Sequence, residues 1–124
     1  MKLQPDRAAV PTLTSHGPGW VAIDGTRVTH SVLLSVAGPH QAWAAPRFED
    51  LTADHFAQLA GLDVEVVIFG SGRKIRFPHP RWLAPLAARR IGLETMDTPA
   101  ACRTYNILAQ EGRRVVGALL LEAN

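Results

Sequence analysis

The amino-acid sequence predicts an α/β fold in a single domain, and three observations support this prediction. The apolar, β-branched run Val64–Phe69 leads straight into Gly70-Ser71-Gly72, which is typical of a buried parallel strand that ends at a tight turn. Helical and strand patterns then alternate to the end of the chain, as they do in an α/β sandwich. The 124 residues are enough for one ordinary hydrophobic core.

The beginning of the chain predicts an irregular arm and then an antiparallel hairpin. Residues 1–18 hold three prolines, which cannot donate backbone hydrogen bonds, so we expect an irregular arm there and one domain over residues 19–124. Trp20–Ile23 and Arg27–Val36 are predicted to pair across Asp24-Gly25-Thr26, because an Asp-Gly pair readily adopts the positive φ of a hairpin turn. The hairpin is therefore an N-terminal addition to the α/β sandwich.

A helix is predicted between this hairpin and the Val64–Phe69 strand. A short third strand over Gln41–Ala45 precedes it. Thr52 is a suitable N-cap, and Gly61 ends the helix after Leu59 or Ala60. Helical spacing places three apolar residues on one face, which we expect to be buried: Phe56, Leu59 and Ala60.

A second helix is predicted after the Gly-Ser-Gly turn. Lys74–Phe77 has no decisive pattern and is interpreted as a short extended piece. Pro80 favours a helix start, since the first helical position needs no N–H group, and Gly92 is expected to end the helix. The expected buried face consists of Trp82, Leu83, Leu86 and Ala87.

The last third of the chain predicts strand, helix, strand. Leu93–Met96 is a short strand, and Asp97-Thr98-Pro99 indicates a helix start with Thr98 as N-cap and Pro99 in the first helical position. We expect this helix to reach Glu111, just before Gly112. Arg114–Leu121 is apolar on both faces, which predicts a central strand of the sheet.

Charge, hydropathy and cysteine content argue against a nucleic-acid-binding, membrane-spanning or secreted protein. The net charge is +2, but residues 70–124 carry nine basic against four acidic residues, so any electropositive surface belongs to the second half. The basic residues are too dispersed and the aromatic residues too few for nucleic-acid binding. No apolar run approaches the roughly 20 residues of a membrane-spanning helix. The lack of an apolar signal core and the single cysteine, Cys102, predict a cytoplasmic protein.

The loop Gly70–Arg73 is the strongest candidate site. If Val64–Phe69 and Leu93–Met96 are parallel, this loop and the helix start at Thr98 lie at the same edge of the sheet. Backbone amides, a helix N-terminus and a guanidinium would then favour an anion, with Arg103 one turn into the helix. The alternative is that the two glycines only permit a tight turn.

Other reactive side chains have structural interpretations. Cys102 is interpreted as a buried core residue and Ser71 as a turn serine, because its surroundings differ from the nucleophile elbow of serine hydrolases. The five histidines lack metal-ligand spacing, so no metal site is expected. Asn106 is either buried, with its amide tying the helix to the Gly70 loop, or exposed and without a role.

The stretches Thr95–Asn106 and Val67–Gly72, together with Trp43, resemble a family of small proteins of unknown function from bacteria and archaea. Eukaryotic relatives of this family include the mitochondrial respiratory complex I assembly factor 3 and an adipogenesis-associated protein. The similarity covers the chain from about Trp20 onward. The matching positions are Gly70, Gly72, Thr98, Ala101, Arg103, Tyr105, Asn106, Glu111 and Arg113. The resemblance implies a three-layer fold with a mixed central sheet, an antiparallel last strand and no established catalytic activity.

Two functional interpretations follow. The first is a non-enzymatic protein-binding domain whose partners are respiratory-complex subunits, since the mitochondrial relative acts in assembly through protein contacts. The second is an anion- or small-molecule-binding protein, or an unrecognised enzyme, that uses Gly70, Ser71, Gly72, Arg73, Thr98, Arg103 and Asn106. We expect no cofactor, metal, nucleic acid or membrane insertion, and homo-oligomers are left open.

Overall fold

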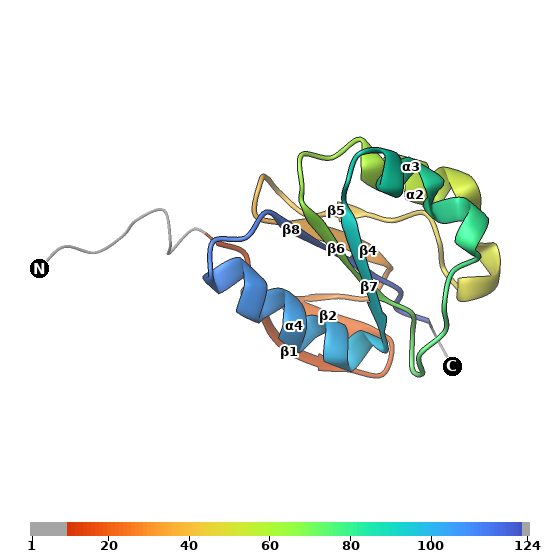
Figure 1. Cartoon of the computed structure of the whole chain (residues 1–124). Coiled ribbons are helices and arrows are strands. Elements are labelled where there is room, and N and C mark those ends of the chain that lie inside the picture. The colour runs from red at the N-terminus through yellow and green to blue at the C-terminus, as the bar shows by residue number, and fades with distance from the viewer. Residues whose placement is uncertain (1–9, 123–124) are drawn as a thin grey trace, which may run out of the picture.

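In the computed structural model, residues 10–122 are described and form two sheets flanked by helices (Figure 1). The antiparallel sheet contains β1 (Leu13–Gly17), β2 (Trp20–Ile23) and β3 (Thr26–Val28). The larger sheet has the order β5-β4-β8-β6-β7 and is built from β4 (Val32–Ser35), β5 (Gln41–Ala42), β6 (Val66–Gly70), β7 (Gly92–Met96) and β8 (Val115–Leu119). The helices are α2 (Ala53–Ala60), α3 (Ala84–Ala88) and α4 (Thr98–Gln110), with 3-10 turns η1 (Phe48–Asp50) and η2 (Pro80–Leu83).

The larger sheet is mixed, with β8 near its centre. β6 runs parallel to both β7 and β8, whereas β4 runs antiparallel to β8 and to β5. All five residues of β8 are buried, which confirms the central position predicted from its apolar faces. The expectation of an antiparallel last strand holds only on the side that faces β4.

Two hydrophobic cores lie on opposite faces of the larger sheet. Alternate residues of β6 enter different cores, because successive side chains of a strand point to opposite faces. Ile68 packs with α4 and the small sheet, whereas Val67 and Phe69 pack with α2 and Leu86 of α3. The layers are therefore the small sheet with α4, the larger sheet, and the helices α2 and α3 (Figure 1).

The connections of the parallel strands leave the sheet toward different faces. The chain from β6 to β7 passes through α3 on one face, and the chain from β7 to β8 passes through α4 on the other. The loops that follow β6 and β7 therefore diverge at the carboxyl edge. Such a switch point is where α/β sheets commonly bind ligands.

The small sheet corrects the prediction of an irregular arm over residues 1–18. Residues 13–17 form β1, which pairs with β2, whereas residues 1–9 lie outside the described part. The amide of Asn106 supports β1: its Oδ1 accepts from Leu13 N at 2.9 Å and its Nδ2 donates to Leu13 O at 2.8 Å. The hydroxyl of Tyr105 also donates to Pro11 O. These tertiary contacts come from α4 and have no local sequence signal.

The predicted strand Arg27–Val36 is divided between the two sheets. The turn at Asp24-Gly25 has positive φ at both residues, as predicted, and β3 returns beside β2. The chain then crosses to the larger sheet at Ser31, whose Oγ accepts from Leu121 N and whose carbonyl accepts from Trp43 N. The side chain of Trp43, the next residue after β5, is buried in a hydrophobic core. The strand β5 therefore has two residues instead of the predicted five.

The helices largely follow the predictions. Thr52 caps α2, and its backbone N–H donates to His55 Nδ1 at 3.0 Å. The second predicted helix begins as the 3-10 turn at Pro80 and ends well before Gly92, because Arg90 reverses the chain with φ 57°. Only Leu86 of its expected face is fully buried, and Ala87 is exposed. No helix within residues 10–122 has the length and apolarity required to cross a membrane.

Candidate functional site

The loop after β6 and the start of α4 are joined by the side chain of Thr98. Gly72 N donates to Thr98 Oγ1 at 2.9 Å, and this hydroxyl donates to Leu120 O at the same distance. Thr98 N also donates to Gly72 O at 2.8 Å. The predicted N-cap is wrong by one residue, since Asp97 caps α4 by accepting from Ala100 N. Thr98 is thus left to link three chain segments at the carboxyl edge.

The interior of the Gly70–Arg73 loop is tightly hydrogen-bonded. Ser71 is fully buried, and its Oγ accepts from Arg76 N and donates to Lys74 O, both at 2.8 Å. Ser71 N donates to Met96 O at 2.9 Å. The turn-serine interpretation is therefore confirmed. The amides of Ser71 and Gly72 both donate within the protein, so an anion bound nearby depends on side chains.

Both glycines of the loop occupy positions with little room for a side chain. A Cβ at Gly70 would lie 3.0 Å from Thr98 Oγ1 and 3.1 Å from Ala101 Cβ. Gly72 has φ +106°, and a Cβ there would lie 2.6 Å from Glu122 Oε1. The first glycine allows α4 to approach the sheet, and the second allows the loop to turn.

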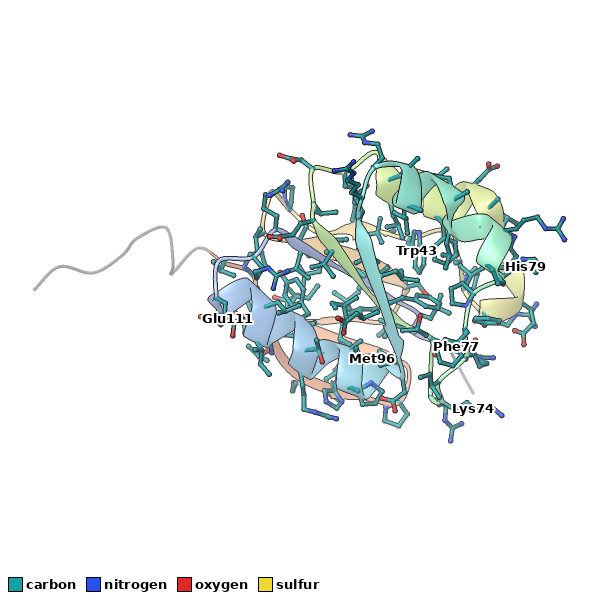
Figure 2. All side chains as sticks on the ribbon, viewed as in Figure 1. Trp43, Lys74, Phe77, His79, Met96 and Glu111 are labelled. Carbon is teal, nitrogen blue, oxygen red and sulfur yellow. The ribbon has the colours of Figure 1, made fainter. Side chains whose placement is uncertain are left out.

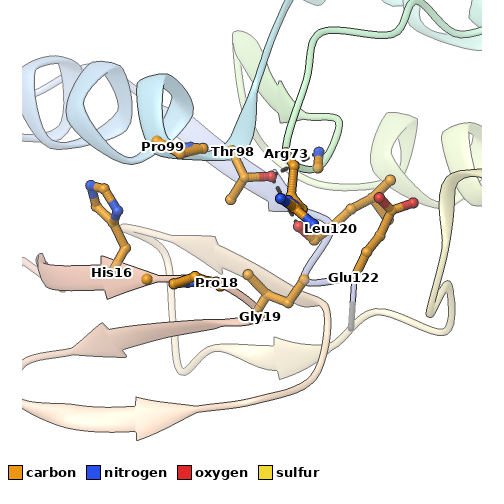
Figure 3. A pocket seen from close by; sticks show the side chains of 11 residues that line it. His16, Pro18, Gly19, Arg73, Thr98, Pro99, Leu120 and Glu122 are labelled. Atoms are coloured by element: carbon orange, nitrogen blue, oxygen red, sulfur yellow. Dashed lines mark hydrogen bonds between the residues drawn. The ribbon is translucent and has the colours of Figure 1, made fainter. Parts of the chain in front are cut away.

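A pocket of about 330 Å³ opens beside this junction (Figure 3). One wall is the turn between β1 and β2, and the opposite wall comes from the Gly72 loop, the start of α4 and the segment after β8. Its surface is mainly apolar. The lining residues are His16, Gly17, Pro18, Gly19, Gly72, Arg73, Thr98, Pro99, Leu120, Leu121 and Glu122.

The structure brings together only some of the predicted site residues. Gly72, Arg73 and Thr98 line the pocket, with Gly70 and Ser71 in the strand and loop that lead into it. Arg103 is exposed on α4 and does not line the pocket. Asn106 binds β1 rather than the Gly70 loop, which corrects that prediction. The wall formed by β1 and β2 was outside the sequence prediction, since residues up to 18 were expected to be irregular.

An ion pair that the sequence did not reveal fixes the far side of the loop. Arg76 Nη2 lies 2.5 Å from Glu122 Oε1 and 2.8 Å from Ser71 O, and its guanidinium covers the Phe48 ring. Glu122 Oε2 also accepts from Phe48 N at 2.7 Å. The two charges are 46 residues apart, so no local motif could have indicated them.

The pKa of Glu122 reflects these contacts. Burial alone would raise its pKa, but the hydrogen bonds from Arg76 and Phe48 N outweigh burial and leave the pKa below its usual range. A lowered folded-state pKa stabilises the protein above the unfolded-state pKa, and this contribution is lost as the pH falls through the folded-state value.

We therefore expect Glu122→Gln to destabilise the protein at pH 7 and to matter less in acid. The measurement is the free energy of urea unfolding from pH 7 to pH 3, in which the difference between wild type and variant should shrink below about pH 4.5. Glu49→Gln is the matched control, because Glu49 lies 3.6 Å from Arg76 and is mostly exposed. A pH-independent difference for Glu122→Gln would contradict the ionic role.

Cys102 lies away from the pocket. It is a residue of α4 whose side chain is buried in the core, and burial raises the pKa of its thiol to about 11, so it is not activated for nucleophilic chemistry. Within residues 10–122, no three His, Cys, Asp or Glu side chains are grouped to hold a metal ion.

Solved structures share this fold. A Bordetella parapertussis protein is 43% identical, with a TM-score of 0.86 over 92% of this chain and 98% of the other. A Bordetella pertussis protein described as an Mth938-like domain is 36% identical, with a TM-score of 0.83 over 100% of this chain and 94% of the other. These similarities confirm the mixed α/β fold.

Sequence relatives include mammalian proteins named as assembly factors. The human NADH dehydrogenase [ubiquinone] 1 alpha subcomplex assembly factor 3 is 32% identical over 96% of this chain, and the mouse protein of that name is 38% identical over 64%. The chain spans only 65% and 43% of their respective lengths. An uncharacterized Rhodobacter capsulatus protein is 35% identical over 94% of this chain and 90% of its own length. A family described as protein of unknown function, DUF498/DUF598, matches residues 13–120, and the chain therefore belongs to that family.

Proposed function

We propose that this protein binds a protein partner in the cytoplasm and thereby assists the assembly of a respiratory NADH dehydrogenase. Relatives named as assembly factors of that enzyme support the proposal. Binding rather than catalysis is the role that we assign to the chain. The structural observation that carries the proposal is the exposed segment Arg73–Phe77, which we call the 73–77 loop.

The 73–77 loop exposes apolar side chains next to basic ones. Phe77 is 70% exposed and Ile75 is 49% exposed, and Lys74 lies exposed beside them. Figure 2 shows Lys74 and Phe77 on the loop that leaves the carboxyl edge of the larger sheet. Exposed aromatic and aliphatic groups with neighbouring cations are typical of protein contact surfaces, where an aromatic residue often supplies most of the binding energy.

The inward side of the same loop holds this surface in place. Arg76 turns inward to Glu122 and Ser71, between the outward Ile75 and Phe77. Its backbone N–H also donates to Ser71 Oγ. Because the loop is anchored through Arg76, little conformational entropy is lost when its exposed side chains bind a partner.

The proposal is tested by affinity capture of tagged protein from its native cells, membranes included, with mass spectrometry of the recovered proteins. We expect wild type to recover subunits of a respiratory NADH dehydrogenase, and Phe77→Ser to recover about tenfold less, because truncating an aromatic anchor removes much of the binding energy. Ile107→Ser is the matched control, since Ile107 is 58% exposed but lies on α4.

Two results would count against the proposal. Capture by wild type without any respiratory subunits would remove the assembly role. Equal recovery by Phe77→Ser and wild type would show that the partner does not bind through the 73–77 loop.

A further inference from the structure

The pocket beside Thr98 has rigid, mainly apolar walls. Its volume of about 330 Å³ is at the small end of the range for pockets that take organic ligands. Pro18 lies on one wall and Pro99 on the opposite wall (Figure 3), and the ring of each proline fixes the local backbone. Leu120 and Leu121 line the pocket from the segment after β8, and both belong to the hydrophobic cores. Such a preformed space suits a small ring compound, because little has to move when the ligand enters.

The polar groups at the start of α4 are already bonded within the protein. The hydroxyl of Thr98 accepts from Gly72 N and donates to Leu120 O, and Thr98 N donates to Gly72 O. Pro99, the next residue, has no N–H group. Neither Thr98 nor Pro99 therefore offers an N–H group to an anion in the pocket.

The charged side chains of the pocket are also engaged within the protein. Glu122 forms an ion pair with Arg76, and its Oε2 accepts from Phe48 N at 2.7 Å. Arg73, which lies between Thr98 and Glu122 in Figure 3, already interacts within the protein. A ligand ion would lose its water of hydration here without gaining a counter-charge of its own, which is unfavourable. The pocket therefore favours an uncharged ligand.

His16 supplies a polar contact at the rim of the pocket. It lies exposed on β1, on the wall opposite the Gly72 loop (Figure 3). An imidazole carries at least one N–H group in either protonation state, so it can donate a hydrogen bond to a ligand. A carbonyl on the ligand would find its donor there, while the ring packs between the prolines.

We propose that this pocket binds an uncharged, flat ring compound, with its ring between Pro18 and Pro99 and a carbonyl or similar acceptor directed to His16. The proposal goes beyond partner binding and does not depend on it, since Ile75 and Phe77 do not line this pocket. It assigns a ligand to the switch point between β6 and β7, held by apolar contact rather than by the amides of the glycine loop.

The test is a titration of isotope-labelled protein with acetophenone, followed by amide chemical shifts in NMR spectra. We expect saturable shifts at Gly17, Gly19, Gly72 and Glu122, which line the pocket, and no comparable shifts in α2. The Kd should be on the order of 1 mM, as expected for a ligand with so few atoms. Benzoate and benzamidinium have nearly the same shape as acetophenone but carry a negative and a positive charge. Each should bind at least about tenfold more weakly, because its charge loses water without compensation.

Two variants at neighbouring positions of α4 test whether the ligand lies in the pocket. Pro99→Glu places a carboxylate on the pocket wall and should raise the Kd for acetophenone about tenfold or more. Ala100→Glu adds the same charge at a residue that does not line the pocket, and it should change the Kd by less than about twofold. Both substitutions place an acidic residue in the first turn of a helix, where the helix dipole favours it. The amide spectrum of each variant shows whether it is folded.

Shifts that are localised to the pocket and lost selectively in Pro99→Glu would support the proposal. Four results would each overturn it: no localised shifts, shifts centred on Ile75 and Phe77, binding of benzoate or benzamidinium as tight as that of acetophenone, or equal effects of Pro99→Glu and Ala100→Glu. Phe77→Ser protein should bind acetophenone normally, so failure of partner binding and failure of this proposal are distinguishable.

Discussion

Gly72→Ala is expected to lower the free energy of unfolding by about 3 kcal/mol, as measured by urea denaturation. The φ of +106° at Gly72 is strained for any residue with a Cβ. The new Cβ would also lie 2.6 Å from Glu122 Oε1 and 2.8 Å from Arg76 Nη2. These are the far ends of flexible side chains, but they are paired with each other, so moving them aside disturbs the ion pair and adds to the backbone strain.

Gly25→Ala isolates the contribution of strain alone. Gly25 has φ +88° in the β2–β3 turn, and a Cβ there would meet no heavy atom within 4 Å. We expect this variant to cost about 1 to 2 kcal/mol, less than Gly72→Ala. If the two variants were equally destabilised, the close packing of Gly72 against the ion pair would have no energetic importance.

Thr98→Val is the second substitution with a large expected effect, again about 3 kcal/mol of stability. Valine has nearly the shape of threonine, but it cannot accept from Gly72 N or donate to Leu120 O. Both bonds are buried, so the loss of each leaves a polar group without this partner in the interior. Hydrogen exchange at Gly72 N should accelerate in parallel with the loss of stability.

Thr98→Ser is the control for this prediction, because it keeps the hydroxyl and removes one methyl group. We expect it to cost about 1 kcal/mol and to retain slow exchange at Gly72 N. A Thr98→Val protein as stable as Thr98→Ser would show that the hydroxyl does not hold the loop to α4.

The parts of the fold that follow from local patterns were predictable from the sequence. The β-branched run before Gly70 gave a strand because it is apolar on both faces, and Thr52 and Gly61 bounded α2 through ordinary capping chemistry. The predictions of strands are wrong where contacts between residues far apart in the sequence determine the structure. β1 depends on Asn106, which is 93 residues away, and the break at Ser31 depends on Leu121.

The candidate site was predictable in position but not in composition. Parallel pairing of β6 and β7 placed the Gly70–Arg73 loop beside Thr98, as expected from strand order alone. The one-residue shift of the N-cap to Asp97 could not be foreseen, since Asp and Thr cap helices about equally well. The wall from the β1–β2 turn and the Arg76–Glu122 pair arise only from tertiary folding.

The central place of β8 has a consequence for synthesis on the ribosome. β8 is translated after every other strand of the larger sheet, yet it separates β4 from β6 and contributes to both cores. Without β8, the pairing seen in the fold leaves two separate strand pairs, β4 with β5 and β6 with β7, each with an unpaired edge. The five-stranded sheet therefore cannot be completed until β8 is available to pair with both β4 and β6.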